Sequence, residues 1–265
     1  INLEQYGITK DFLDRYTKGE ETDFGELIQS FPAPVEISAI IEDMKVPFSK
    51  SLLFDSKNSG NFETVYKQAL GLGVYCADLG YLNVYKKTGE VISYLVSIRE
   101  LSEELKLGQF FDFPVLKRVA ASNSIDSLMT LSTMSYWNMD EHLRESGRSN
   151  ISALLVTGVW TESLYLAGQV YLKKSNKRMR DHIASQKVVL DALIPVLIHY
   201  MDNNIDYVKL VSAFKELDKA FQTVNIEQVE GEGGAVSTVV NVSDDDMVQL
   251  CKAIENLRKK ITEAL

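Results

Sequence analysis

Apolar residues recur at steps of three and four along most of the chain, which is the pattern of amphipathic helices. The clearest stripes run from Val91 to Leu105, from Met179 to Met201, from Leu210 to Phe221 and from Met247 to Leu265. Only five prolines interrupt the 265 residues, so these helices can run for many turns. Long helices with narrow apolar stripes pack side by side and nearly antiparallel. The predicted fold class is therefore all-α, a bundle of long helices.

Two regions depart from the helical period. Residues 1–60 predict short helices joined by turns, with Pro34 in the first turn of a helix whose stripe is Ile37, Ile40, Ile41 and Met44. In residues 224–242, β-branched residues alternate with other residues after a glycine-rich turn at 231–234, which predicts one β-hairpin before the last helix. An unstructured crossover loop is the alternative. The acidic residues around this turn predict that the hairpin projects from the core as an acidic flap.

These elements predict a single helical domain over residues 1–265. It comprises a short-helix region (1–60), a main bundle (61–222), the acidic hairpin (223–242) and a C-terminal helix (243–265) that Ser243 would cap. Residues 73–79 weakly resemble residues 158–164. The likeness indicates either an internal duplication of helical hairpins or two buried helices with similar requirements.

Residues 151–172 form the most apolar stretch of the chain. Glu162 is its only charge, and its length satisfies the criterion of roughly 20 residues for a membrane span. Its polar residues, however, suit a lipid-facing helix poorly; they are Ser152, Thr157, Thr161, Ser163 and Gln169. We therefore predict the most buried helix of the bundle, and no transmembrane helix in this chain.

The most informative residues lie in the two apolar helices. Glycines at 71, 73 and 80 on one, and at 158 and 168 on the other, suggest close helix approach or room for a ligand, with Gly80 as a predicted contact. The candidate ligand-binding residues among them are Asp78, Tyr81, Trp160 and Glu162. A buried carboxylate needs hydrogen-bond donors. One interpretation is a polar network that fixes helix register, another is a pocket for a small polar ligand, and a third is catalysis by the two carboxylates.

Composition and motif content argue against several classes of function. There are 28 Lys and Arg against 37 Asp and Glu, giving a net charge of −9, which argues against nucleic-acid binding. Basic residues cluster only at 173–180, at the predicted joint of two helices. There they would stabilise the C-terminal end of the preceding helix. Binding of an acidic partner or an anionic surface is the alternative. The three histidines lack metal-ligand spacing, and no phosphate-binding glycine loop is present. We expect no cofactor, no metal and no catalytic residues.

Cys76 and Cys251 are too few for a disulfide scaffold. Both fall in helical segments, where the default role of a cysteine is that of a small buried hydrophobe. We therefore expect free, buried thiols. Pairing in an oxidising compartment would require the two Cα atoms to lie within about 7 Å of each other.

Several segments together resemble an uncharacterised all-helical family of Bacteroidetes bacteria. They are residues 31–37 (FPAPVEI), 72–75 (LGVY) with 78–81 (DLGY), 107–113 (LGQFFDF), and 158–162 (GVWTE) with 164–166 (LYL). The resemblance covers most of the chain. Because members look like secreted proteins or lipoproteins, it implies a cell-envelope location, periplasmic or anchored to the outer membrane. It also implies a removed signal peptide and a lipid anchor upstream of Ile1. The resemblance brings no activity and no site residues.

The sequence thus favours a non-catalytic, envelope-associated protein that binds a protein partner or a small polar ligand. An enzyme with a carboxylate-centred pocket is one alternative, and a structural component of an envelope assembly is another. A polar pocket without paired acid and base groups would favour the first. Two convergent titrating groups in a cleft would favour the enzyme, and an exposed apolar patch would favour the structural component.

Overall fold

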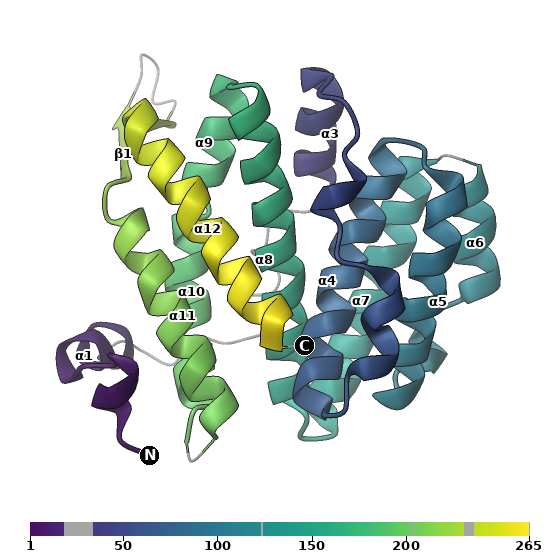
Figure 1. The fold of residues 1–265 in the computed structure, drawn as a ribbon, viewed down its shortest axis with the longest axis horizontal. Coiled ribbons are helices and arrows are strands. Elements are labelled where there is room, and N and C mark those ends of the chain that lie inside the picture. Colours follow the sequence, from purple (N-terminus) through teal and green to yellow (C-terminus); the bar gives the residue numbers. More distant parts are fainter. Residues whose placement is uncertain (19–33, 123, 203, 231–235, 265) are drawn as a thin grey trace. The chain divides into compact units, whose positions relative to one another are not determined.

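The computed structural model describes residues 1–18, 34–122, 124–202, 204–230 and 236–264. The described part of the chain contains eleven α-helices and one two-stranded antiparallel sheet (Figure 1). The helices are α1 (Lys10–Thr17), α3 (Pro34–Met44), α4 (Val65–Val84), α5 (Thr88–Glu104), α6 (Phe113–Ala121), α7 (Ile125–Glu145), α8 (Ser149–Lys173), α9 (Lys177–Ser185), α10 (Lys187–His199), α11 (Ile205–Phe221) and α12 (Asp244–Ala264). The all-α prediction, including the hairpin before the last helix, is confirmed.

Contacts divide the chain into two compact units. The first comprises residues 1–31 and 168–260, and the second comprises residues 32–167 and 261–265. Helix α8 contributes its C-terminal turns to the first unit and the rest of its length to the second. Whether the two units act as the single predicted domain stays a prediction.

The second unit is built around α4. Helix α4 packs against α5 and α3, and α6 contacts both α5 and α7. The predicted apolar stripe of α3 is confirmed at Ile40, Ile41 and Met44, which are buried, while Ile37 is half-buried. Between α3 and α4 the chain runs through residues 45–64, here called the strap, whose only regular structure is the short 3-10 turns η2 (Lys50–Leu52) and η3 (Ser56–Asn61). The short-helix character predicted for residues 1–60 is confirmed where the structure describes them.

Helix α8 has the length and hydropathy of a membrane span, and no other helix in the described ranges does. Of its most apolar window, 89% is buried inside the structure. Such burial is typical of a core helix. It agrees with the prediction of a buried bundle helix that was made from the polar residues in this stretch.

The first unit holds the N-terminal segment and the last helices of the chain. Helix α1 begins at the cap residue Thr9, whose side chain accepts a hydrogen bond from the Phe12 amide at 3.3 Å. The segment packs against α10 and α11, where Ile8 and Phe12 become fully buried. Two side chains of α11 also bind the backbone of this N-terminal segment: Ser212 donates to the Tyr6 carbonyl at 2.7 Å, and Lys215 donates to the Gly7 carbonyl.

The hairpin pairs β1 (Asn225–Glu230) with β2 (Val236–Asn241) in a register that joins Asn225 to Asn241. Its tip, residues 231–235, lies outside the described residues, so the acidic flap stays a prediction. Ser243 caps α12 as predicted, accepting from the Asp246 amide at 3.1 Å.

The single helix predicted from Met179 to Met201 is wrong. The structure has two helices, α9 and α10, that meet at Gln186. The Gln186 amide bonds to the Ile183 carbonyl at 3.1 Å, a tighter i−3 contact that ends α9. Ile183 and Leu190 are seven positions apart and both buried, so the apolar stripe continues across a break that its period cannot reveal.

Candidate functional site

Asp78 and Tyr81, two of the four candidate residues, lie on the buried side of α4 and bind the strap. One carboxylate oxygen of Asp78 accepts a hydrogen bond from the Phe54 amide at 3.0 Å. The Tyr81 hydroxyl accepts from the Ser49 amide at 3.2 Å. Burial raises the pKa of the Tyr81 phenol, and the Asp78 charge adds to the rise, so the two groups also influence each other. Both side chains therefore satisfy backbone donors of an irregular segment.

Other side chains of α4 and α5, and that of Tyr85 directly after α4, satisfy the strap's carbonyl groups. Tyr75 donates to the Asp55 carbonyl at 2.9 Å, Tyr85 to the Val46 carbonyl at 2.7 Å, Tyr94 to the Phe54 carbonyl at 2.8 Å and Ser97 to the Ser56 carbonyl at 2.8 Å. Stacked and tilted rings reinforce the contact, with the Phe54 and Tyr75 centroids 5.6 Å apart. A segment without regular structure leaves its backbone groups to be paired by side chains, and here six side chains supply the partners. Sequence analysis missed Tyr85, Tyr94 and Ser97.

Trp160 and Glu162, the other two candidates, lie on α8 in the second unit. Trp160 is buried, and Glu162 is entirely inaccessible at 0% exposure, like Asp78. The prediction that Glu162 faces the interior is confirmed. Its role, as part of a structural network or as a ligand contact, stays open.

Glu162 therefore suits a stability test of its role. If the role is structural, Glu162→Gln is expected to keep much of the hydrogen bonding, while Glu162→Leu leaves donors unpaired at a cost of about 1–3 kcal/mol. If the residue serves a ligand, Glu162→Leu is expected to spare or raise stability, because binding sites are often held at a cost to the fold. Thermal melts of both variants distinguish the two roles, and a leucine variant as stable as wild type contradicts the structural one.

Helices α4 and α8 cross at their glycines. A Cβ atom placed on Gly73 would lie 2.2 Å from the Leu155 carbonyl oxygen, and one on Gly158 would lie 2.3 Å from the Leu70 carbonyl oxygen. Both neighbours are backbone atoms that cannot turn aside. Gly71 is equally tight, against the Phe62 ring at 2.2 Å, whereas Gly168 has only ordinary contact with Cys251. Gly73 and Gly158 are both required at this crossing, which accounts for part of the resemblance between residues 73–79 and 158–164. The internal duplication of helical hairpins stays a prediction.

The predicted close approach at Gly80 is wrong. A Cβ atom there would meet nothing within 4 Å. Gly80 lies on the half-exposed side of α4, seven positions after Gly73. The glycine pattern indicated the helix that makes a close crossing but not which of its glycines faces the partner helix.

A buried carboxylate that sequence analysis did not single out joins α7 to α8. Asp140 accepts from the Arg144 guanidinium at 2.9 Å and from the Ser152 hydroxyl at 2.5 Å. Arg144 lies one turn further along α7. The i,i+4 spacing of Asp140 and Arg144 could have predicted their ion pair from the sequence. Asp140 and Ser152 are almost fully buried, so no substrate reaches the pair. Its chemistry is that of a structural anchor between helices.

In the described part of the second unit, the buried polar atoms without a hydrogen-bond partner include Oγ1 of Thr161, which lies between the candidates Trp160 and Glu162 on α8, and Nδ2 of Asn83 on α4. A buried polar group without a partner usually contacts an ordered water or a small bound molecule. The Thr161 hydroxyl is thus a buried polar group next to the two predicted residues of α8.

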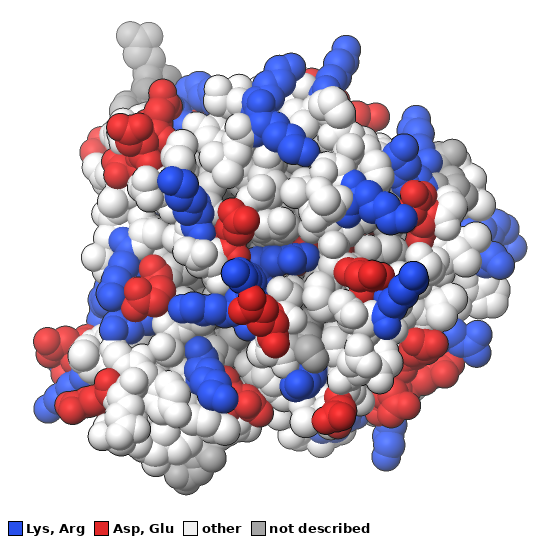
Figure 2. All heavy atoms as spheres, in the orientation of Figure 1, with Lys and Arg blue, Asp and Glu red and all other residues white. Residues whose placement is uncertain are grey.

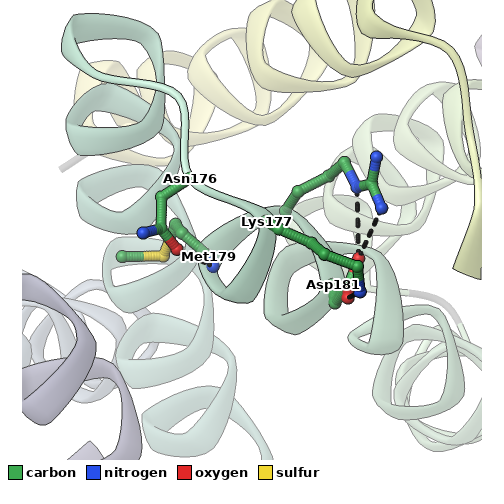
Figure 3. A network of polar contacts seen from close by, with 5 residues as sticks. Asn176, Lys177, Met179 and Asp181 are labelled. Carbon is green, nitrogen blue, oxygen red and sulfur yellow. Dashed lines mark hydrogen bonds and ion pairs between the residues drawn. The ribbon is translucent and has the colours of Figure 1, made fainter. Parts of the chain in front are cut away.

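The basic cluster at 173–180 forms the joint between α8 and α9, where residues 172–178 are exposed. The Arg180 guanidinium contacts Asp181 at 3.1 Å and 3.0 Å. Lys177 pairs with the same carboxylate, and Asn176 caps α9 by accepting from the Met179 amide at 3.1 Å (Figure 3). Asp244 also acts here: burial raises the pKa of Tyr171, Asp244 raises it further and Arg180 opposes the rise. Asp181 thus neutralises part of the cluster, and the stabilising role stays a prediction.

On the face that Figure 2 shows, Lys and Arg side chains alternate with Asp and Glu side chains. Such mixing is typical of an ordinary protein surface, and it matches the absence of a basic, nucleic-acid-binding composition.

In the described ranges, no group of three or more His, Cys, Asp or Glu side chains is placed so that it could hold a metal ion. His142 packs its ring against Phe110 at 5.1 Å and His199 against Tyr200 at 4.9 Å. These two histidines therefore make ring contacts with neighbouring aromatic side chains.

Both cysteines are free thiols. Cys251 is buried as predicted, while Cys76 is half-buried. Burial raises the pKa of each thiol to about 12. Since the thiolate is the reactive form, neither cysteine has the environment of a nucleophile.

Reactivity of Cys251 tests this environment. In a Cys76→Ser background, we expect the folded protein to react with a thiol reagent at pH 8 far more slowly than the same chain in guanidinium, where the thiol pKa returns to about 8.5. Absorbance of the released thiolate measures both rates. Rapid reaction of the folded protein would contradict a buried thiol with a raised pKa.

Comparison of this chain with known protein families, curated proteins and solved structures gives no match.

Proposed function

We propose that the protein is a non-catalytic, envelope-associated interaction protein that meets its partner through the outer face of α5. The observation that carries this proposal is a pair of exposed apolar side chains, Ile92 at 46% and Val96 at 50% exposure. They are four residues apart and so occupy one face of the helix. The opposite face of α5 packs into the second unit through Val91, Leu95 and Ile98. Neighbouring apolar residues left in solvent on an otherwise well-packed helix are typical of contact surfaces. A structural component of an assembly shares this feature with an interaction protein, so the stoichiometry of the complex decides between the two.

The non-catalytic part of the proposal rests on how buried polar groups are used. Asp78 and Tyr81 hold the strap, and Asp140 joins α7 to α8. A catalytic pair needs its reactive atoms open to a substrate. These carboxylates are closed to solvent, and the hydrogen bonds described above are those of a scaffold.

The envelope location rests on the resemblance described above. A partner at the envelope would be a protein with an apolar contact surface. A fixed stoichiometry in a large assembly would indicate the structural component, and a reversible complex would indicate a binding protein.

The test replaces both residues in the full-length protein expressed in its native cells. We expect the wild-type protein to fractionate with the envelope and to migrate in native electrophoresis as a complex larger than the monomer. Ile92→Lys with Val96→Lys is expected to leave the melting temperature nearly unchanged, because exposed substitutions cost about 0.5 kcal/mol or less, and to release the monomer. The matched control is Val188→Lys, an exposed valine of the first unit at 67% exposure. A wild-type protein that is monomeric, or that lies outside the envelope fraction, contradicts the proposal.

A second candidate, binding of a small polar ligand, is favoured by the unpartnered hydroxyl of Thr161 beside Glu162. Native mass spectrometry of the purified protein tests it. A bound molecule adds mass under native conditions that disappears on denaturation, and Thr161→Val is expected to remove it while Thr161→Ser retains it. Equal masses under both conditions contradict this candidate.

A further inference from the structure

The exposed face of α5 extends in both directions from Ile92 and Val96. Gly89 lies one turn before Ile92 and is exposed, and a Cβ atom placed on it would meet nothing within 4 Å. Arg99 lies one turn after Val96, and its side chain is 62% exposed. Residues at steps of three and four share one side of a helix, so these four lie along one stripe. The stripe is apolar at its centre, bare at its N-terminal end and charged at its C-terminal end.

Charges of opposite sign dominate the two ends of α5. Lys86 and Lys87 directly precede the helix; Lys86 is exposed and Lys87 is half-buried. The last turns of the helix carry three exposed acids, which are Glu100, Glu103 and Glu104. The N-terminal approach to the helix is therefore basic, and its C-terminal turns are mainly acidic.

A second copy of the chain matches this face when the two α5 helices run antiparallel. A two-fold axis midway between Ile92 and Val96 places each of these residues opposite the other one in the second copy. The same axis places Gly89 opposite Arg99 of the second copy. The bare backbone at Gly89 then leaves room for the long arginine side chain, while the apolar pairs meet at the centre.

The charges agree with this register. Opposite charges from the two copies fall within one position of it in three cases, which are Lys86 with Glu103, Lys87 with Glu100, and Glu90 with Arg99. Lys106, beyond the end of α5, has no charged residue at its matching position. Parallel helices would instead set the two basic ends against each other. Complementary charges of this kind fix the register and orientation of a contact.

We propose that the partner met by α5 is a second copy of this chain, in an antiparallel two-fold dimer formed by the outer faces of both α5 helices. The inference rests on the proposed function, because it names the partner of the same surface. A contact made by one helix from each copy lies at the low end of protein interfaces, below about 1,200 Å². We therefore expect a reversible dimer.

Sedimentation velocity of the purified chain across the micromolar range tests the dimer. The sedimentation coefficient of the wild-type protein is expected to rise with concentration from the monomer value towards the dimer value. Ile92→Lys with Val96→Lys is expected to abolish this rise, because four cations would meet at the centre of the contact. Val188→Lys, an exposed substitution in the first unit, is the matched control and is expected to keep the rise.

Charge reversal tests the antiparallel register. Lys86→Glu and Glu103→Lys are chosen because both side chains are exposed. Each variant alone places like charges opposite each other in both halves of the two-fold contact, so each is expected to raise the dissociation constant of the dimer by about tenfold. An equimolar mixture of the two variants is expected to recover the wild-type association, because the heterodimer again pairs opposite charges in both halves.

A purified wild-type chain that stays monomeric at every concentration overturns the proposal. A dimer that survives Ile92→Lys with Val96→Lys also overturns it, as does a mixture of the charge variants that associates no better than each variant alone. These outcomes differ from failure of the proposed function, which requires the wild-type protein to be monomeric, or outside the envelope fraction, in its native cells. A purified monomer beside a native complex that the α5 variant disrupts would mean that the partner is a different protein.

Discussion

Replacing Gly73 by Ala is expected to lower the free energy of unfolding by about 3 kcal/mol, at the upper end of the cost of overpacking. The new methyl group would lie 2.2 Å from the Leu155 carbonyl oxygen and 2.7 Å from the Val159 backbone nitrogen, so α4 and α8 must separate. Separation exposes apolar surface along both helices. Chemical denaturation of the variant measures the loss of unfolding free energy, provided that the slope of this free energy against denaturant concentration is the same as in the wild-type protein.

Gly80→Ala is the matched control on the same helix. Nothing lies within 4 Å of the added methyl group, and alanine is favoured over glycine in a helix by about 0.5–1 kcal/mol. The two substitutions are therefore expected to change stability in opposite directions. Equal effects of the two would contradict a close crossing at Gly73.

Asp78→Leu is expected to lower the free energy of unfolding by about 1–3 kcal/mol, because the Phe54 amide would lose its acceptor in a buried setting. Asp78→Asn keeps an acceptor of the same shape and is expected to cost less. Thermal melts compare the two. A leucine variant as stable as wild type would mean that the carboxylate does not hold the strap.

Local patterns predicted those parts of the fold that depend on neighbouring residues. The cap at Ser243, the stripe of α3 and the β-branched alternation of 236–241 each act within a few positions, so their structures followed from the sequence. The burial of α8 followed from its composition. The break at Gln186 did not, because a stripe can cross a tight turn without changing its period.

The candidate site was predicted only in part, and the reason is physical. The burial of Asp78, Tyr81, Trp160 and Glu162 could be expected from the apolar residues around them. Their partners could not, because an amide of an irregular segment carries no side-chain signature. Likewise Tyr16 and Asp218 are 202 residues apart, and only the packing of α1 on α10 and α11 brings them together.

The central claim is that the buried polar side chains of α4 serve the fold by binding the strap. Amide exchange at Ser49 and Phe54, followed by nuclear magnetic resonance, tests it most directly. Both amides are expected to be protected in the wild-type protein, although neither belongs to a helix or strand. Tyr81→Phe should release Ser49 alone, and Asp78→Leu should release Phe54. Wild-type amides that exchange as fast as those of an unfolded peptide would contradict the account.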